Sequence, residues 1–85
     1  MNKNEINDFR PLTRAGALRT VPCKCLRMRP TKEQAIEAFA KDGMVVADFE
    51  VECIFLAHVM TACGKLYTYD GSHGGGQVFT FEGVV

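Results

Sequence analysis

Apolar and polar positions alternate with a period of two in three stretches of this chain and recur with a helical period in two others. Side chains alternate between the two faces of a strand, whereas one face of a helix collects residues three and four positions apart. The pattern predicts an α+β fold in the order β-α-α-β-β. It would consist of a basic N-terminal strand, two helices and a C-terminal antiparallel hairpin.

The basic strand is predicted over Thr20 to Arg29, with the sequence TVPCKCLRMR. Its alternation places Lys24 on the opposite face from Cys23 and Arg29. Pro22 has no backbone N–H to donate, which places it at the start of the strand or on a sheet edge. Arg29 precedes a proline and therefore favours extended geometry, so the strand is expected to end there.

The first helix is predicted over residues 31–42. Thr31 and Gln34 have the spacing of a capping box, in which each side chain bonds an unpaired backbone N–H of the first turn. Ala35, Ile36 and Phe39 form an apolar stripe, and the Asp-Gly pair at 42–43 supplies the C-terminal stop.

A second helix is predicted over residues 48–63, with Asp48 as its N-cap. Apolar residues would surround most of this helix, and such a helix favours burial on nearly every side. We therefore expect a homodimer that forms through residues 48–63. An alternative interpretation makes Met44 to Phe55 a strand, because this stretch is rich in β-branched residues.

The C-terminal hairpin is predicted from two alternating strands, residues 65–69 and 77–81, joined by a glycine-rich connection. Its four aromatic side chains would share one face and pack against the helices. They are Tyr67, Tyr69, Phe79 and Phe81.

The length of 85 residues limits the chain to one small domain, predicted over residues 20–85. Residues 1–19 are predicted to be a basic flexible arm, because Pro11 and Gly16 interrupt any helix there. The polar N-terminal stretch has no secretory signal, and the longest apolar run, 53–62, is too short to span a bilayer. We therefore expect a cytoplasmic protein with no membrane partner.

The formal net charge of zero conceals a strong asymmetry between the two ends of the chain. Residues 1–32 carry eight cations and two anions, and residues 33–85 carry two cations and eight anions. Such asymmetry indicates either a surface that attracts a charged partner or two halves of the chain that attract each other. The predicted partner-binding residues are Arg10, Arg14, Arg19, Lys24, Arg27 and Arg29. A second, acidic surface able to imitate phosphates is predicted at Glu33, Glu37, Asp42 and Asp48.

The residues that might carry chemistry do not form a motif. Cys23 and Cys25 make a C-x-C pair, but structural zinc sites present C-x₂₋₄-C pairs that converge with further ligands. Cys53, His58 and Cys63 are spaced by five, which on a helix turns each ligand away from the last. The glycines of residues 70–76 lead into a strand rather than a helix, unlike a phosphate-binding loop. We expect no catalytic residue, no cofactor and no bound metal.

These observations favour a non-enzymatic binding or inhibitor protein whose partner is a protein complex or a nucleic-acid-binding protein. In its small size, its lack of a catalytic motif and its segregated charge, the chain resembles small proteins of phages and mobile elements that inhibit a host complex, anti-CRISPR proteins among them. One alternative is a small nucleic-acid-binding regulator that uses the basic arm and strand. A second alternative is a metal-binding protein built on the cysteines.

Overall fold

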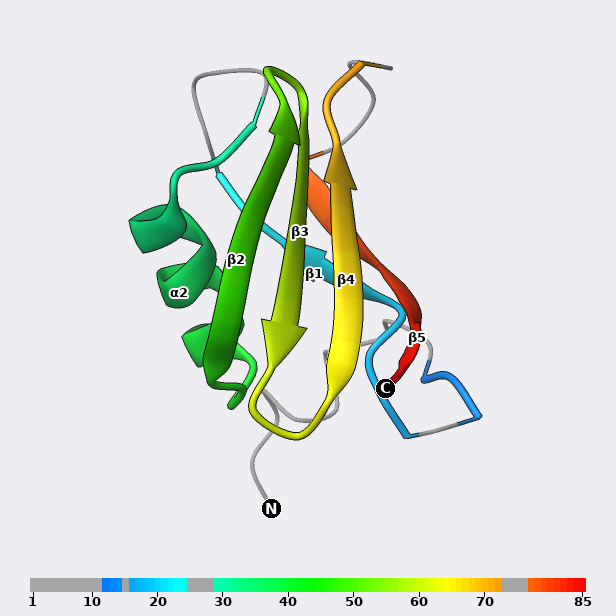
Figure 1. The fold of residues 1–85 in the computed structure, drawn as a ribbon. Helices are drawn as coiled ribbons and strands as arrows, with labels where there is room; N and C mark the ends of the chain where they lie inside the picture. Colours follow the sequence, from blue (N-terminus) through cyan, green and yellow to red (C-terminus); the bar gives the residue numbers. More distant parts are fainter. Residues whose placement is uncertain (1–11, 15, 25–28, 73–76) are drawn as a thin grey trace.

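The computed structural model of the chain describes residues 12–14, 16–24, 29–72 and 77–85. Within these residues the elements follow the order β-α-β-β-β-β. They are β1 (Thr20–Pro22), α2 (Lys32–Lys41), β2 (Val46–Cys53), β3 (Leu56–Thr61), β4 (Lys65–Asp70) and β5 (Val78–Val84). The strands form an antiparallel sheet in the order β1-β5-β4-β3-β2 (Figure 1).

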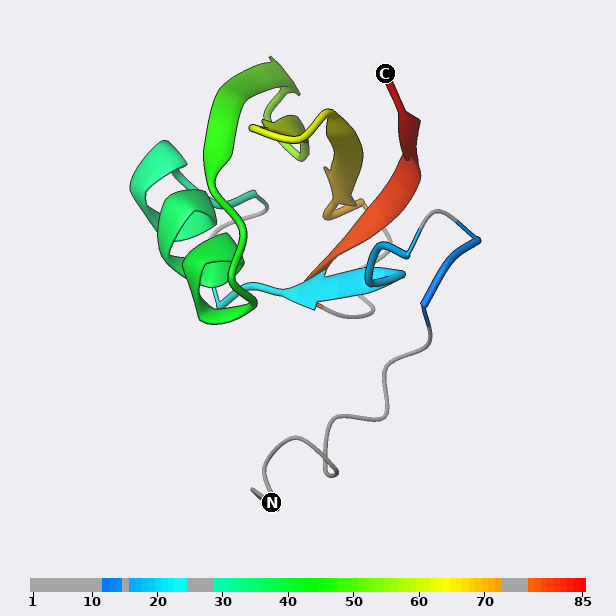
Figure 2. The same ribbon diagram turned by 90° about the horizontal axis from the view of Figure 1, so that it is seen from below.

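The sheet is strongly curved around helix α2. Strands β2 to β5 form a meander, and β1 joins it by pairing with β5, with Val21 opposite Phe79. In Figure 2 the strands follow an arc, and α2 stands at its open side between β1 and β2. The helix packs against both of these edge strands. The concave side of the sheet therefore holds the core, and the convex side faces outward.

The predicted second helix is wrong, and with it the α+β fold of order β-α-α-β-β, because the described residues form mostly antiparallel sheet with a single short helix. Residues 48–63 form strands β2 and β3, which pair through a tight turn at Ile54 and Phe55. Phe49 lies opposite Val59, so apolar residues with a helical spacing instead meet across two strands. The β-branched residues of this stretch pack well on a pleated surface, which favours the alternative strand interpretation. The expectation of a homodimer through residues 48–63 rested on a helix that does not form, and the dimer itself stays a prediction.

Helix α2 forms where the capping box predicts it. Thr31 Oγ1 accepts from the Gln34 N–H at 3.1 Å, and Thr31 N–H donates to Gln34 Oε1 at 2.9 Å. The helix ends in a Schellman motif, in which Met44 N–H donates to Phe39 O and Gly43 N–H donates to Ala40 O. Gly43 has φ of +77°, a conformation that glycine adopts without strain.

The aromatic face of the predicted hairpin is confirmed and contributes Tyr67, Tyr69 and Phe79 to the buried core. Tyr67 pairs with Phe81 and Tyr69 with Phe79 across β4 and β5. Phe39 of α2 packs edge-on against Tyr67 and Phe79, with ring centroids 5.1 and 5.0 Å apart. The prediction that this face packs against two helices is corrected, because it packs against α2 alone among the described helices.

The predicted basic strand of residues 20–29 is shorter in the structure. Strand β1 ends at Pro22, and the Cys23 N–H extends the pairing by donating to Gln77 O at 2.7 Å. Residues 25–28 lie outside the described residues. Part of the predicted arm contacts the domain, because Ala17 is buried and Phe81 N–H donates to Arg19 O at 2.8 Å.

We expect Phe39→Ala to lower the free energy of unfolding by about 3–5 kcal/mol, because a fully buried ring leaves a cavity between α2 and the sheet. Urea unfolding followed by circular dichroism measures this change. Ile36→Ala on the same helix is the matched control, since Ile36 is 43% exposed and its loss is expected to cost under about 1 kcal/mol. Equal destabilisation by the two variants would contradict this assignment of the core.

Candidate functional site

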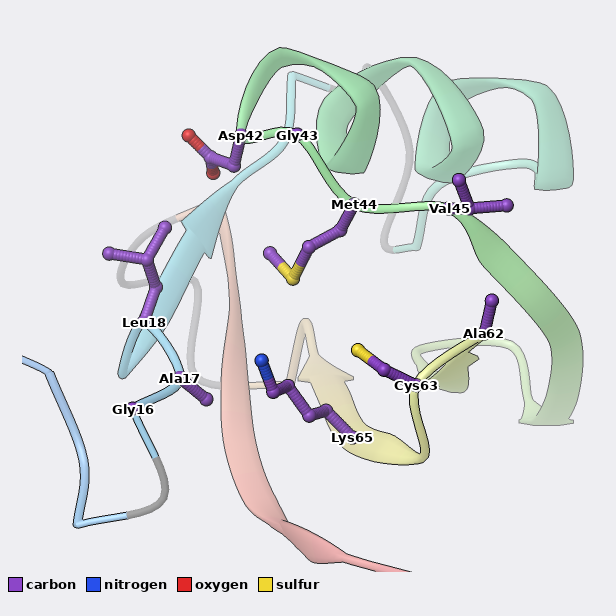
Figure 3. Close-up of a pocket in the computed structure, with 10 residues that line it drawn as sticks. All are labelled: Gly16, Ala17, Leu18, Asp42, Gly43, Met44, Val45, Ala62, Cys63 and Lys65. Carbon is purple, nitrogen blue, oxygen red and sulfur yellow. The ribbon is translucent and has the colours of Figure 1, made fainter.

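A cavity of about 480 Å³ opens at one end of the curved sheet. Three segments far apart in the chain form its walls: residues 16–18, residues 42–45 at the end of α2, and residues 62–65 between β3 and β4. Figure 3 shows the side chains of Met44, Cys63 and Lys65 directed toward one another across the cavity. A thioether, a thiol and an ammonium group therefore converge there.

Local turn chemistry positions each wall of this cavity. The Schellman motif at the end of α2 turns the chain so that Met44 enters the cavity. The turn between β3 and β4 is closed by the Gly64 N–H donating to Thr61 O at 2.9 Å, with Gly64 at φ +86°. The third wall is anchored by Tyr67, whose hydroxyl donates to Leu18 O at 2.7 Å.

The Cys63 thiol has an unusual environment. Thr61 is 1% exposed, and its Oγ1 accepts from the Lys65 N–H at 3.1 Å. The Cys63 sulfur lies 3.4 Å from Thr61 Oγ1, and once the thiol is ionised the Thr61 hydroxyl is the group that donates to it. This hydrogen bond and the charge of Lys65, opposed by some desolvation, hold the pKa of the Cys63 thiol below its ordinary value. An exposed thiol with a lowered pKa reaches its nucleophilic thiolate form at lower pH than an ordinary cysteine.

From the sequence, Cys63 is weighed only as a possible metal ligand, together with Cys53 and His58. Cys23 is buried, and its sulfur contacts Gln34 O at 3.7 Å. Cys25 and His73 lie outside the described residues. Within the described residues, no three His, Cys, Asp or Glu side chains come together to hold a metal ion. The sequence signal for Cys63 is the spacing Thr-x-Cys-Gly-Lys at residues 61–65. This spacing indicates a contact between the hydroxyl and the thiol only when the residues are known to form a hairpin turn.

A second feature is the outer face, the convex side of β2, β3 and β4. Ala57, Val59 and Tyr67 are buried on the concave side, so the residues alternating with them point outward. We define the outer face as Asp48, Glu50, Glu52, Leu56, His58, Met60, Leu66 and Thr68. No described helix or strand covers it (Figures 1 and 2).

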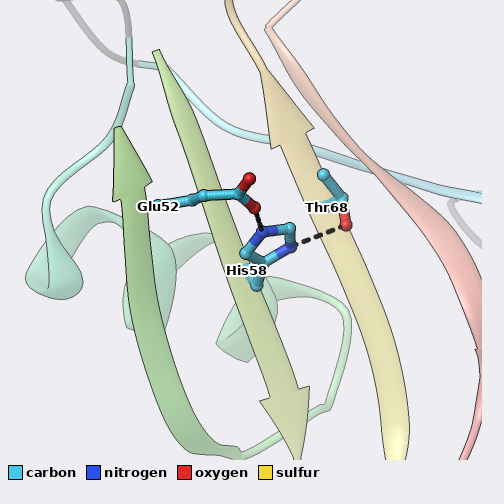
Figure 4. A network of polar contacts seen from close by, with 3 residues as sticks. All are labelled: Glu52, His58 and Thr68. Carbon is cyan, nitrogen blue, oxygen red and sulfur yellow. Dashed lines mark hydrogen bonds and ion pairs between the residues drawn. The ribbon is translucent and has the colours of Figure 1, made fainter. Parts of the chain in front are cut away.

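His58 links three strands on the outer face (Figure 4). Its Nδ1 lies 3.0 Å from Thr68 Oγ1, and its Nε2 lies 2.6 Å from Glu52 Oε1. In the strand register, Glu50 and Thr68 are the direct neighbours of His58 on either side. The arrangement connects edge strand β2 to the centre of the sheet, so a structural role accounts for it.

The predicted basic residues are placed in part by the structure. Arg14, Arg19 and Lys24 are exposed, and the last two flank strand β1. Arg29 is half-buried, and its Nε has no hydrogen-bond partner. Among the described residues, none of these four cations forms an ion pair with a carboxylate. Arg10 and Arg27 lie outside the described residues.

The predicted acidic residues belong to different parts of the fold. Glu33 and Glu37 are exposed on α2, and Asp42 caps its C-terminal end. Asp48 lies on β2, where it joins two carboxylates of the same strand on the outer face. Because β1 and β2 are opposite edges of the sheet, the cations beside β1 and the carboxylates of β2 are displayed separately.

In the described part of the chain, no helix has both the length and the apolar character needed to cross a membrane. Helix α2 is ten residues long and carries charged side chains near both ends.

We expect Cys63 to react with iodoacetamide faster than half-buried Cys53 does, and to remain reactive at lower pH than an ordinary thiol. The rate should fall as the pH drops through the lowered pKa of Cys63, because the thiolate becomes protonated. Thr61→Val removes the hydroxyl and should shift the pH profile upward, whereas Thr61→Ser should retain it. Peptide mapping over a pH series measures these rates, and unchanged profiles in both variants would contradict the role of Thr61.

Comparisons with protein families, curated proteins and solved structures find no match to this chain.

Proposed function

We propose that this protein is a non-enzymatic binding protein that occludes a basic, nucleic-acid-binding surface of a partner protein. The observation that carries the proposal is the outer face, in which half-buried apolar side chains adjoin a row of carboxylates with no described element over them. Protein interfaces commonly combine an apolar centre with a polar rim in this way.

The apolar centre consists of Met60 and Leu66, while Leu56 lies beyond His58 at the other end of β3. Met60 and Leu66 lie directly opposite each other on β3 and β4, so their side chains form a continuous surface. On the other side of Met60 lies Asp48 of the edge strand. The apolar centre is thus bordered by acidic residues on the β2 side.

The acidic row consists of Asp48, Glu50 and Glu52, which are exposed at alternate positions of β2. Alternate residues of a regular strand lie about 6.6–6.8 Å apart, so Asp48 and Glu50 begin a line of negative charge along β2. Glu52, which bonds His58 beside an irregularity of the pairing, continues this line. Such a line is complementary to a surface of lysines and arginines that binds phosphates. We infer that the partner is a protein of this kind.

The same carboxylates also discourage other chains from pairing with β2, because charged residues and bulges protect edge strands. Strand β2 has irregular pairing near both of its ends. Protection of the edge requires charge but not an apolar centre beside it. The combination of Met60 and Leu66 with the acidic row is what supports docking.

The character of an inhibitor is supported by the size and charge of the chain, which resemble those of small phage and mobile-element proteins that block a host complex. We place the protein in the cytoplasm, a reducing compartment that suits the free thiols of Cys53 and Cys63.

A second candidate function is direct nucleic-acid binding through the β1 side. It is favoured by Arg14, Arg19 and Lys24, which are exposed and form no ion pair within the described part of the chain. Cations of this kind bind phosphates through counterion release, with an affinity that falls steeply with salt. A gel shift with single- and double-stranded DNA over a salt series tests it, and absence of binding at low salt excludes it.

The docking proposal predicts that Asp48→Asn/Glu50→Gln/Glu52→Gln weakens binding to a fluorescent arginine-rich peptide by roughly tenfold at low salt, since each exposed charge contact contributes about 0.5 kcal/mol. The matched control is Glu33→Gln/Glu37→Gln/Glu82→Gln, which removes the same charge elsewhere. Fluorescence anisotropy measures both affinities. Met60→Ser should also weaken binding, by removing apolar contact.

Equal weakening by the outer-face and control variants would show that net charge alone attracts the peptide, and would overturn the docking proposal. Circular dichroism of each variant verifies that the sheet remains folded.

A further inference from the structure

We propose that Cys63 is a site of reversible thiol–disulfide exchange with small anionic disulfides, and that the adjoining cavity receives the group that becomes attached to the sulfur. The inference concerns the end of the β3–β4 hairpin and does not depend on the function proposed for the outer face. It rests on the arrangement of Thr61, Cys63, Lys65 and Met44 around the cavity.

The Cys63 sulfur is accessible and lies against a hydroxyl that the fold holds in place. Cys63 is exposed, and the buried hydroxyl of Thr61 lies 3.4 Å from its sulfur. Thr61 is held in place because its oxygen accepts the Lys65 N–H, and the turn is held by Val85 N–H donating to Gly64 O at 2.7 Å. The hydrogen-bond donor to the sulfur is therefore part of the fold rather than a mobile surface group.

The cavity beside Cys63 has the size and charge to receive a small anionic group. A cavity of about 480 Å³ lies within the range of about 300–1,000 Å³ that is typical of small-molecule sites. Lys65 directs its ammonium group toward the cavity, and no ion pair within the described residues neutralises it. In Figure 3 the carboxylate of Asp42 stands at the rim, turned away from Met44, Cys63 and Lys65. The charge inside the cavity therefore favours an anionic group.

The chemical step is balanced by the disulfide itself. The Cys63 thiolate attacks one sulfur of the incoming disulfide, a new S–S bond forms, and the original S–S bond breaks. The leaving thiolate keeps the electron pair of the broken bond and takes a proton from water. A second small thiol reverses the reaction by the same displacement at the mixed disulfide.

The other described cysteines are less suited to this reaction. Cys23 is buried, which denies a disulfide access to its sulfur, and Cys53 is half-buried. Met44 contributes an apolar wall on which the carbon chain of an attached group can pack. The structure thus distinguishes Cys63 by access, by its hydrogen-bond donor and by the cavity beside it.

The test treats the reduced full-length protein with three disulfides of different charge: oxidised glutathione, hydroxyethyl disulfide and cystamine. Intact mass and peptide mapping follow each modification over time. We expect Cys63 to be modified at least about tenfold faster than Cys53, and added thiol to reverse the mass increase. Relative to the neutral disulfide, oxidised glutathione should react about threefold faster and cystamine more slowly, as expected for one exposed charge contact.

Two variants separate the charge of the cavity from the reactivity of the sulfur. Lys65→Gln should abolish the preference for the anionic disulfide, and Cys63→Ser should remove the fast modification altogether. Cys53→Ser is the matched control and should leave both unchanged. Faster reaction at any other cysteine, or an unaltered charge preference in Lys65→Gln, would overturn the proposal.

Discussion

The contact of one phenylalanine with two aromatic rings of the sheet is the interaction on which the rest of the structure depends. Phe39 is fully buried and meets Tyr67 and Phe79 edge-on, which joins the open side of the curved sheet to α2. In edge-to-face contacts the positive edge of one ring meets the negative face of the next, and burial of the rings excludes water. The helix is thereby held on the concave side, and the convex side remains available as the outer face.

The same core also prepares the cavity. Tyr67 keeps its ring against Phe39, and its hydroxyl reaches Leu18 O, so the segment before β1 is tied to the rings that hold the helix. Helix α2 in turn delivers Met44 to the cavity through its Schellman end. The Cys63 turn is therefore surrounded by segments whose positions all depend on one aromatic cluster.

Sheet topology determines how the charge of the chain is displayed. Strands β1 and β2 begin 26 positions apart in the sequence. They are the opposite edges of the sheet because β1 pairs with β5, at the end of the meander farthest from β2. The cations near β1 and the carboxylates of β2 consequently occupy different edges, and no ion pair within the described part of the chain joins the two sets. Unneutralised charge at an edge acts at a distance in solution, which is the property that a docking protein uses.

The sequence by itself determined the features that arise between near neighbours. The capping box of Thr31 and Gln34 and the paired aromatics of β4 and β5 follow from residue types at short spacing. Residues 48–63 were ambiguous, because their apolar side chains fit a helical face as well as two strands. Tertiary pairing decided between the two, since Phe49 and Val59 gain partners across the sheet that a lone helix in so small a domain would lack. The outer face and the Cys63 cavity depend on that decision, because both are assembled from strands and turns that only long-range pairing brings together.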